Sequence, residues 1–273
     1  MRFLAFLMTV LPAVALAQTD RAPDDVMDAL RIGEVAAILE REAVATSSDL
    51  VEGLVPQARH GGWARIVARI NDADRVEARL RETFAETLEP DAVAPILAFF
   101  DTALGARIIG LELSAREVLT TPGVEEAAAE RFQEAVANDA PQVPQVEAFI
   151  DANDLIDSNV IGALNANAAF LEGMQDSGAS GLGAFVPEGD IRQEVWRQEP
   201  QIREGTISWV TAFVSLAYDP LPSDDFDAYI AFSQSDAGQA LNQALFAAFD
   251  EVFVATARET GAALAGMLMS EDL

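Results

Sequence analysis

Several residue types that carry enzyme chemistry are scarce or absent in this chain of 273 residues. It contains no cysteine, and His60 is its only histidine. A His/Cys zinc site and a Cys–His nucleophile therefore cannot be assembled within one chain. Lysine is also absent, so Schiff-base chemistry is unavailable. We expect no metal site, no cofactor and no catalytic residues, and the sequence favours a protein that is not an enzyme.

Positive charge is the next deficit. The chain holds 17 Lys+Arg against 45 Asp+Glu, for a net charge of −28. Phosphate backbones and anionic membrane surfaces would repel such a protein, so we expect no nucleic-acid partner. Hydrophobic residues make up 51% of the chain, which is enough to build a core. Because the acids are spread along the chain, they predict an acidic surface. A binder of cations or basic partners is the alternative.

Long apolar runs are missing except at the N-terminus. Arg2 precedes the run Phe3 to Leu11, and the segment ends in the small-residue pattern Ala15-Leu16-Ala17. This pattern predicts a signal peptide over residues 1–17, cleaved after Ala17. A membrane anchor is the alternative, but a span needs about 20 apolar residues, and charge returns at Asp20. We therefore expect an exported chain without a membrane span after cleavage.

Strand signals are nearly absent, and apolar residues recur at helical spacing. A continuous stripe is formed by Val76, Leu80, Phe84 and Leu88. The apolar run Ile207 to Leu216 could be a strand or a buried helix, and its alignment with this stripe favours the helix. We predict a further helix over Val146 to Gly173, interrupted near residues 157–159, and a long one from Gly238 to about Met267. The sequence thus predicts an all-α fold.

One stretch occurs twice. Residues 98–108 read AFFDTALGARI and residues 231–241 read AFSQSDAGQAL, with a constant offset (232 − 99 = 133). Trp63 and Trp196 are separated by the same offset. We therefore predict two tandem multi-helix repeats packed together, Gln18 to Ala140 and Val143 to Leu273, with a linker near residues 138–144.

The repeated motif predicts a helix corner. Thr102 and Ser235 are placed to cap the next helix, and Gly105 follows at the third helical position. A glycine there allows another helix to approach closely, as Gly238 would in the second copy. An anion site at the helix N-terminus is the alternative, but the acids within both motifs, such as Asp101, would repel an anion.

The first copy, Phe99 to Gly105, has the pattern F-[FY]-x-[ST]-x-x-G behind the predicted signal peptide. In this pattern the chain resembles a domain-of-unknown-function family of small helical proteins exported to the proteobacterial periplasm. The resemblance covers about Leu88 to Leu119. It implies a helical periplasmic protein and carries over no catalytic residues.

Two groups of side chains are candidates for binding. Trp63 and Trp196 could anchor a core or a ligand groove, and their equivalent positions favour core roles. The second group consists of helical i,i+4 arginine pairs in a locally basic stretch: Arg65, Arg69, Arg75 and Arg79. These arginines could dock the first repeat onto the acidic second repeat. A partner-binding face is the alternative.

These observations favour a periplasmic interaction or stabilising module without enzymatic activity, whose partner is an unknown protein or small ligand. The alternative is a small-ligand binder with a groove between the repeats, near Trp63 and Trp196. A carboxylate-based hydrolase is a third possibility, and it requires two acids that face each other across a deep cleft.

Overall fold

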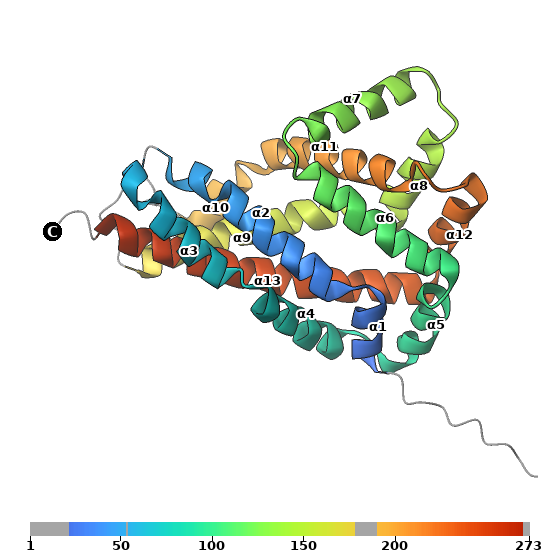
Figure 1. The fold of residues 1–273 in the computed structure, drawn as a ribbon, viewed down its shortest axis with the longest axis horizontal. Coiled ribbons are helices and arrows are strands. Elements are labelled where there is room, and N and C mark those ends of the chain that lie inside the picture. Colours follow the sequence, from blue (N-terminus) through green and yellow to red (C-terminus); the bar gives the residue numbers. More distant parts are fainter. Residues whose placement is uncertain (1–21, 53, 178–189, 270–273) are drawn as a thin grey trace, which may run out of the picture.

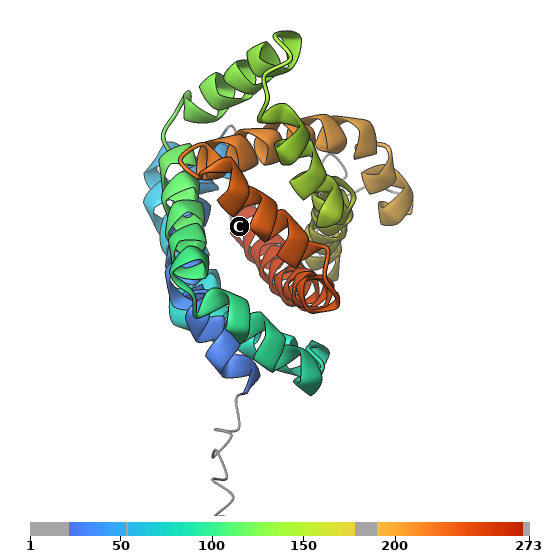
Figure 2. The same cartoon turned by 90° about the vertical axis from the view of Figure 1, so that its right-hand side faces the viewer.

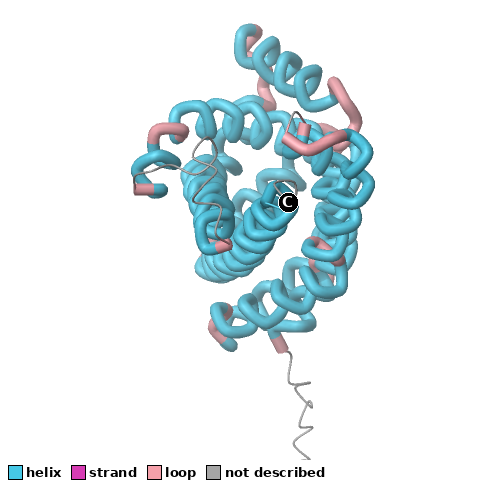
Figure 3. The backbone as a smooth tube through the Cα atoms, turned by 90° about the vertical axis from the view of Figure 1, so that its left-hand side faces the viewer, coloured by secondary structure: helices cyan, strands magenta, loops and turns pink. Residues whose placement is uncertain are grey.

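The computed structural model describes residues 22–52, 54–177 and 190–269, and this part of the chain is α-helical apart from one short 3-10 turn, η1 (Gln57–Arg59), with no strand. The predicted all-α fold is confirmed. The predicted signal peptide, residues 1–17, and the outermost residues of both predicted repeats lie outside the described residues. Within the described ranges, short loops join successive helices (Figure 3).

The helices form two successive groups. The first half contains α1 (Pro23–Ala29), α2 (Ile32–Val51), α3 (His60–Ile70), α4 (Ala73–Thr87), α5 (Pro90–Phe100) and α6 (Ala103–Leu119). One helix, α7 (Val124–Ala137), follows it. The second half contains α8 (Val143–Ala152), α9 (Leu155–Asp176), α10 (Ile191–Trp196), α11 (Glu199–Tyr218), α12 (Ser223–Ser233) and α13 (Asp236–Met269).

Helices of the two halves interlock (Figure 1). Helix α6 of the first half packs on α11 of the second, and α13 of the second half packs on α4 of the first. In Figure 2, α13 lies among helices of both halves, and α7 projects from the rest of the molecule. One large apolar cluster includes residues from α1 to α13, so the two halves share a core. The tandem-repeat arrangement itself stays a prediction.

Element bounds agree with the sequence-based expectations in the later part of each half. Helices α5 and α12 begin and end 133 residues apart, and α6 and α13 begin at the same offset. The run Ile207 to Leu216 lies within α11, as predicted, and α13 continues to Met269. Helix α7 ends at Ala137 and α8 begins at Val143, so the loop between them falls in the predicted linker.

The predicted interruption near residues 157–159 is wrong. The break lies at Asn153 and Asp154, because Asp154 adopts a left-handed conformation with φ 48°. Short polar side chains are the non-glycine residues that tolerate this conformation best. Arg31, with φ 55°, makes the corresponding break between α1 and α2. The breaks at Arg31 and Asp154 lie 123 residues apart (154 − 31). The repeat offset of 133 residues therefore does not extend to the start of each half.

The repeated motif forms a helix corner in both halves. Thr102 Oγ1 accepts a hydrogen bond from the Gly105 amide at 3.0 Å, and Ser235 Oγ accepts one from the Gly238 amide at 3.1 Å. A Cβ on Gly105 would lie 2.5 Å from the Phe100 Cα, and a Cβ on Gly238 would also lie too close to the backbone of the helix before it. The predicted close approach is therefore present. The segment that approaches each glycine is the end of the preceding helix.

The corner also bears on membrane topology. Among the described residues, no single helix is long and apolar enough to cross a membrane. Helices α5 and α6 reach that length and composition only as a pair, and the pair bends by 88° at the corner.

The two helix corners formed by the repeated motif contact each other, because the rings of Phe99 and Phe232 stack with their centroids 4.3 Å apart.

Candidate functional site

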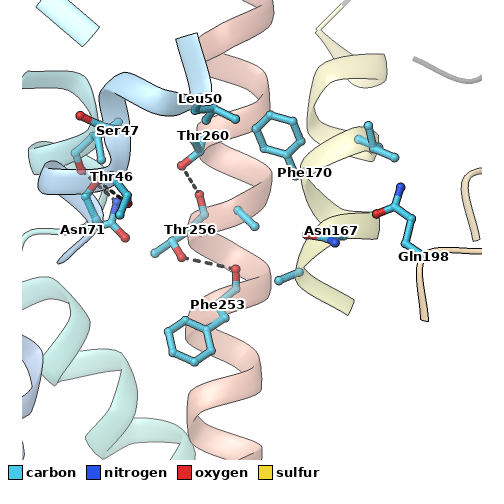
Figure 4. A pocket seen from close by; sticks show the side chains of 15 residues that line it. Thr46, Ser47, Leu50, Asn71, Asn167, Phe170, Gln198, Phe253, Thr256 and Thr260 are labelled. Atoms are coloured by element: carbon cyan, nitrogen blue, oxygen red, sulfur yellow. Dashed lines mark hydrogen bonds between the residues drawn. The ribbon is translucent and has the colours of Figure 1, made fainter. Parts of the chain in front are cut away.

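A groove of about 610 Å³ lies between the two halves. Its walls are formed by α2 and the end of α3 on one side, and by α9 and α13 on the other (Figure 4). Apolar side chains provide much of the lining: Ala43, Leu50, Val67, Ala166, Phe170, Leu171, Phe253 and Ala257. The remaining lining residues are polar: Thr46, Ser47, Asn71, Asn167, Gln198, Thr256 and Thr260.

Among the residues that the structure describes, none that lines this groove is charged, although charged residues make up 23% of the chain. A charged ligand group would therefore find no oppositely charged partner among the lining residues, and removing it from water would cost free energy. The groove is consequently suited to an uncharged molecule.

Glycine contacts hold the wall formed by α9 and α13. A Cβ on Gly173 would lie 2.1 Å from the Arg258 carbonyl oxygen, and a Cβ on Gly261 would lie 2.0 Å from the Phe170 carbonyl oxygen. Only glycine at both positions permits this backbone approach. Phe170 lines the groove, so its backbone contact with Gly261 also helps to position an aromatic side chain of the lining.

The structure separates the two candidate tryptophans. Trp63 is buried in a cluster with Val67 and Phe170, and its Nε1 donates a hydrogen bond of 2.8 Å to the carbonyl oxygen of Ser47. It therefore supports three residues that line the groove without lining it itself. Trp196 does not line the groove, and 66% of its surface is exposed.

The predicted core role of Trp196 is thus wrong. Its helix, α10, is only six residues long and buries Ile191 and Val195 against α9. Trp196 is the last residue of this helix and directly follows the buried Val195, so it lies outside that face. The shared offset from Trp63 does not give the two tryptophans the same environment.

The structure also gives the two predicted arginine pairs different environments. Arg75 and Arg79 on α4 form ion pairs with Glu259 of α13, the second at 3.2 Å. This contact joins the first half to the second, as the docking hypothesis expects. Arg65 and Arg69 are exposed on α3 and have no ion-pair partner among the described residues. They remain available for contact with another molecule.

A half-buried acid that the sequence did not reveal lies at the junction of α6, α11 and α12. Glu112 Oε1 accepts hydrogen bonds from the hydroxyls of Tyr218 at 2.7 Å and Tyr229 at 3.0 Å. Burial raises the pKa of Glu112 above its usual value, and this effect outweighs the two hydrogen bonds, which favour the ionised form. Burial also raises the pKa values of both tyrosines. The chain has only two tyrosines, and both bind this one carboxylate.

A second cavity of about 370 Å³ lies between α7, α8, α11 and α12. Its lining includes Arg131 and Asp219, so it differs from the uncharged groove. Neither cavity is lined by two carboxylates, and the described residues contain no group of three or more His, Asp or Glu side chains that could hold a metal ion. The pair of facing acids that a carboxylate-based hydrolase requires is not found in these two cavities.

No protein-family model, curated protein or solved structure matches the chain. The resemblance of the Phe99 to Gly105 motif to an exported helical family stays a prediction.

Proposed function

We propose that the protein binds an uncharged, mainly apolar small molecule in the groove between its two halves, and that it is not an enzyme. The observation that supports this proposal is that the described part of the chain places no charged residue in the lining, although the net charge is −28. Such a chain repels anions, and the groove offers no counter-ion to any charged group. The predicted export to the periplasm is part of the proposal.

The size and surface of the groove support this function. Its volume of about 610 Å³ falls within the range of about 300–1,000 Å³ that small-molecule sites occupy. Leu50 and Phe253 line it with 39% and 37% of their surfaces exposed to water. A bound apolar molecule would cover these side chains, and that burial would favour binding.

The test uses N-phenyl-1-naphthylamine, an uncharged apolar dye that fluoresces in apolar surroundings. Ala166 and Ala257 line the groove from α9 and α13, and Ala166→Leu together with Ala257→Leu would fill it. We expect the wild-type protein to bind the dye and the double variant to bind it about tenfold more weakly, a loss of about 1.4 kcal/mol. Ala127→Leu is the control, because Ala127 is exposed on α7, outside the groove.

The outcome of this titration decides the proposal. Equal dye affinity in the groove-filled variant and the wild type would contradict it, provided that urea unfolding shows both to be folded. An equal loss of affinity in the Ala127→Leu control would show that the effect is not specific to the groove, which would also count against the proposal.

A second candidate function is an interaction module that contacts an acidic partner through α3. It is favoured by Arg65 and Arg69, which are exposed and lack ion pairs among the described residues. We expect Arg65→Glu with Arg69→Glu to abolish retention of such a partner in a pulldown from periplasmic extract. Arg192→Glu, at another exposed arginine that forms no ion pair with the part of the chain that the structure describes, should leave retention unchanged. Identical partners in wild type and double variant would contradict this function.

A further inference from the structure

The hydroxyl groups in the groove use their hydrogens within their own helices. On α13, Thr256 donates to the Val252 carbonyl oxygen at 2.9 Å and Thr260 donates to the Thr256 carbonyl oxygen at 2.7 Å, as Figure 4 shows for the second bond. On α2, Thr46 donates to Glu42 at 3.0 Å and Ser47 donates to Val44 at 2.6 Å. All four hydroxyls keep their oxygens as acceptors, since a hydroxyl has one hydrogen and two lone pairs.

Asn71, at the end of α3, differs from the hydroxyls. Its Nδ2 donates one of its two hydrogens to the Val67 carbonyl oxygen at 3.0 Å, which leaves the second hydrogen as a donor and the side-chain Oδ1 as an acceptor. Two further amides, Asn167 and Gln198, have no hydrogen-bond partner among the described residues and could still donate, but both are exposed. The hydroxyls of Ser47, Thr256 and Thr260, which are not exposed, keep their hydrogens within their own helices and offer acceptors to a ligand.

A lining of this kind discriminates between ligand head groups. A group that only accepts, such as an ether oxygen or a carboxylate, loses its bonds to water beside Thr256 and Thr260 and finds no donor in these two hydroxyls. A polar group left without a hydrogen bond costs free energy. A hydroxyl that donates to Thr256, Thr260 or Asn71 is satisfied. The groove therefore favours a ligand that brings its own hydrogen-bond donor.

We infer that the ligand is an uncharged apolar alcohol, with its hydroxyl donating to the acceptors of the groove and its hydrocarbon body against Phe170, Leu171 and Phe253. This inference rests on the proposed function and adds the class of head group. Charge and hydrogen bonding agree, because the described lining residues offer no charge partner, and the hydroxyls of Thr256 and Thr260 offer acceptors whose own hydrogens are already used.

Calorimetric titration of the full chain with three molecules of similar size tests the inference. The molecules are 1-octanol, heptyl methyl ether, which accepts but cannot donate, and octanoate, which is anionic. We expect 1-octanol to bind about fivefold to tenfold more tightly than the ether, which corresponds to about one net hydrogen bond. Octanoate should bind more weakly than both.

Two variants locate the hydroxyl contact. Thr256→Val with Thr260→Val keeps the shape of both side chains and removes both acceptors. We expect the preference for octanol over the ether to fall to less than twofold, while the affinity for the ether stays unchanged. Thr211→Val is the matched control, because the Thr211 hydroxyl also donates within its helix, at 2.8 Å to Ile207, but lies outside the groove.

The outcomes separate this inference from the proposed function. If none of the three molecules binds, the proposed function fails. If octanol and the ether bind equally to the wild type, or if octanoate binds most tightly, the groove binds ligands but the inferred alcohol head group is wrong. If the octanol preference persists in the threonine variant, the hydroxyl does not bind where we place it.

Discussion

Two helix pairs in corresponding places of the two halves, α2 with α6 and α9 with α13, are held together by different means. Helices α9 and α13 touch through their backbones, at Gly173 and Gly261. Helices α2 and α6 are joined by long charged side chains: Arg116 binds Glu42 through two hydrogen bonds, at 2.9 and 3.1 Å, and Arg41 binds Glu117 at 3.3 Å. Ion pairs bridge both helix pairs, since Arg258 of α13 also binds Glu172 and Asp176 of α9, but of the two pairs it is α9 and α13 whose backbones touch.

The difference extends along α6. Its Glu112 binds Tyr218 and Tyr229 of the second half, whereas the position 133 residues later on α13 is Leu245. Helices in the same place of the chain order can therefore approach to backbone contact in one half and be joined through side chains in the other. The closely packed pair, α9 and α13, forms a wall of the proposed ligand groove.

The largest expected effect comes from a substitution that forces α9 and α13 apart. In Gly261→Ala the new Cβ would lie 2.0 Å from the Phe170 carbonyl oxygen, so α9 and α13 must separate. We expect the free energy of unfolding to fall by about 3 kcal/mol, at the upper end of overpacking effects. Urea unfolding measures this loss.

The matched control is Gly266→Ala on the same helix, where a Cβ would meet no heavy atom within 4 Å. This change should leave stability unaltered or raise it by up to about 1 kcal/mol, because alanine favours helix over glycine. Similar effects of the two substitutions would show that the glycine contact does not hold the pair together.

The next effect tests the polar docking of α6. In Glu112→Ala the hydroxyls of Tyr218 and Tyr229 lose their acceptor, and we expect a loss of about 2 kcal/mol in urea unfolding. Glu130→Ala on the exposed face of α7 is the control and should change stability little. A loss in Glu112→Ala no larger than in this control would contradict the polar docking.

Glu112 also gives a pH dependence. Burial raises its pKa in the folded state, so the folded protein holds the proton more tightly than the unfolded chain. Its stabilising contribution is complete below the ordinary glutamate pKa of about 4.3 and is lost as the pH rises through the folded pKa. In urea unfolding at a series of pH values, the wild type should therefore lose stability relative to Glu112→Gln as the pH rises from this value. A constant difference between the two proteins would contradict the raised pKa.

The helix corner has the same hydrogen-bonded cap in both halves, so removing the cap should lower stability equally at the two corners. Thr102→Ala and Ser235→Ala each remove a hydroxyl that caps the next helix. We expect each substitution to lower the free energy of unfolding by about 1 kcal/mol. A large loss at one corner and none at the other would show that the two copies of the motif do not play the same part.

The smallest effects distinguish the two ion pairs between α2 and α6. Arg116 is half-buried, pairs with Glu42 through two bonds and lies 5.7 Å from the ring of Trp209, so Arg116→Gln should cost about 1 kcal/mol. Arg41 and Glu117 are exposed, so Arg41→Gln should change stability by less than about 0.5 kcal/mol. Equal losses in thermal unfolding would contradict the difference in burial.

Local patterns in the sequence predicted the all-α fold and the corner motif. Thr102, Ser235 and their glycines act within a few residues of themselves, so their spacing is sufficient to predict their geometry. The break at Asp154 was misplaced because its left-handed conformation has no unique signal in a segment rich in Asp and Asn. The repeat offset predicted where helices begin, but not the environment of Trp196 at the end of α10.

The groove could not be predicted because its residues are far apart in the chain. Thr46 and Thr260 line the same space from α2 and α13, and each resembles an ordinary helix residue in the sequence. Glu112 was one of 45 acids, and only the fold brings it to both tyrosines. Such sites depend on tertiary packing, which residue spacing does not encode.

The central claim is that a small apolar molecule binds between α2 and the α9–α13 wall. Photo-crosslinking of the full chain with a diazirine-bearing octanol, followed by mass spectrometry of its peptides, tests where it binds. We predict modification of residues around Phe170 on α9 and between Phe253 and Thr260 on α13, reduced by an excess of unlabelled octanol. Competed modification confined to the second cavity, near Phe132 and Phe226, would contradict the claim.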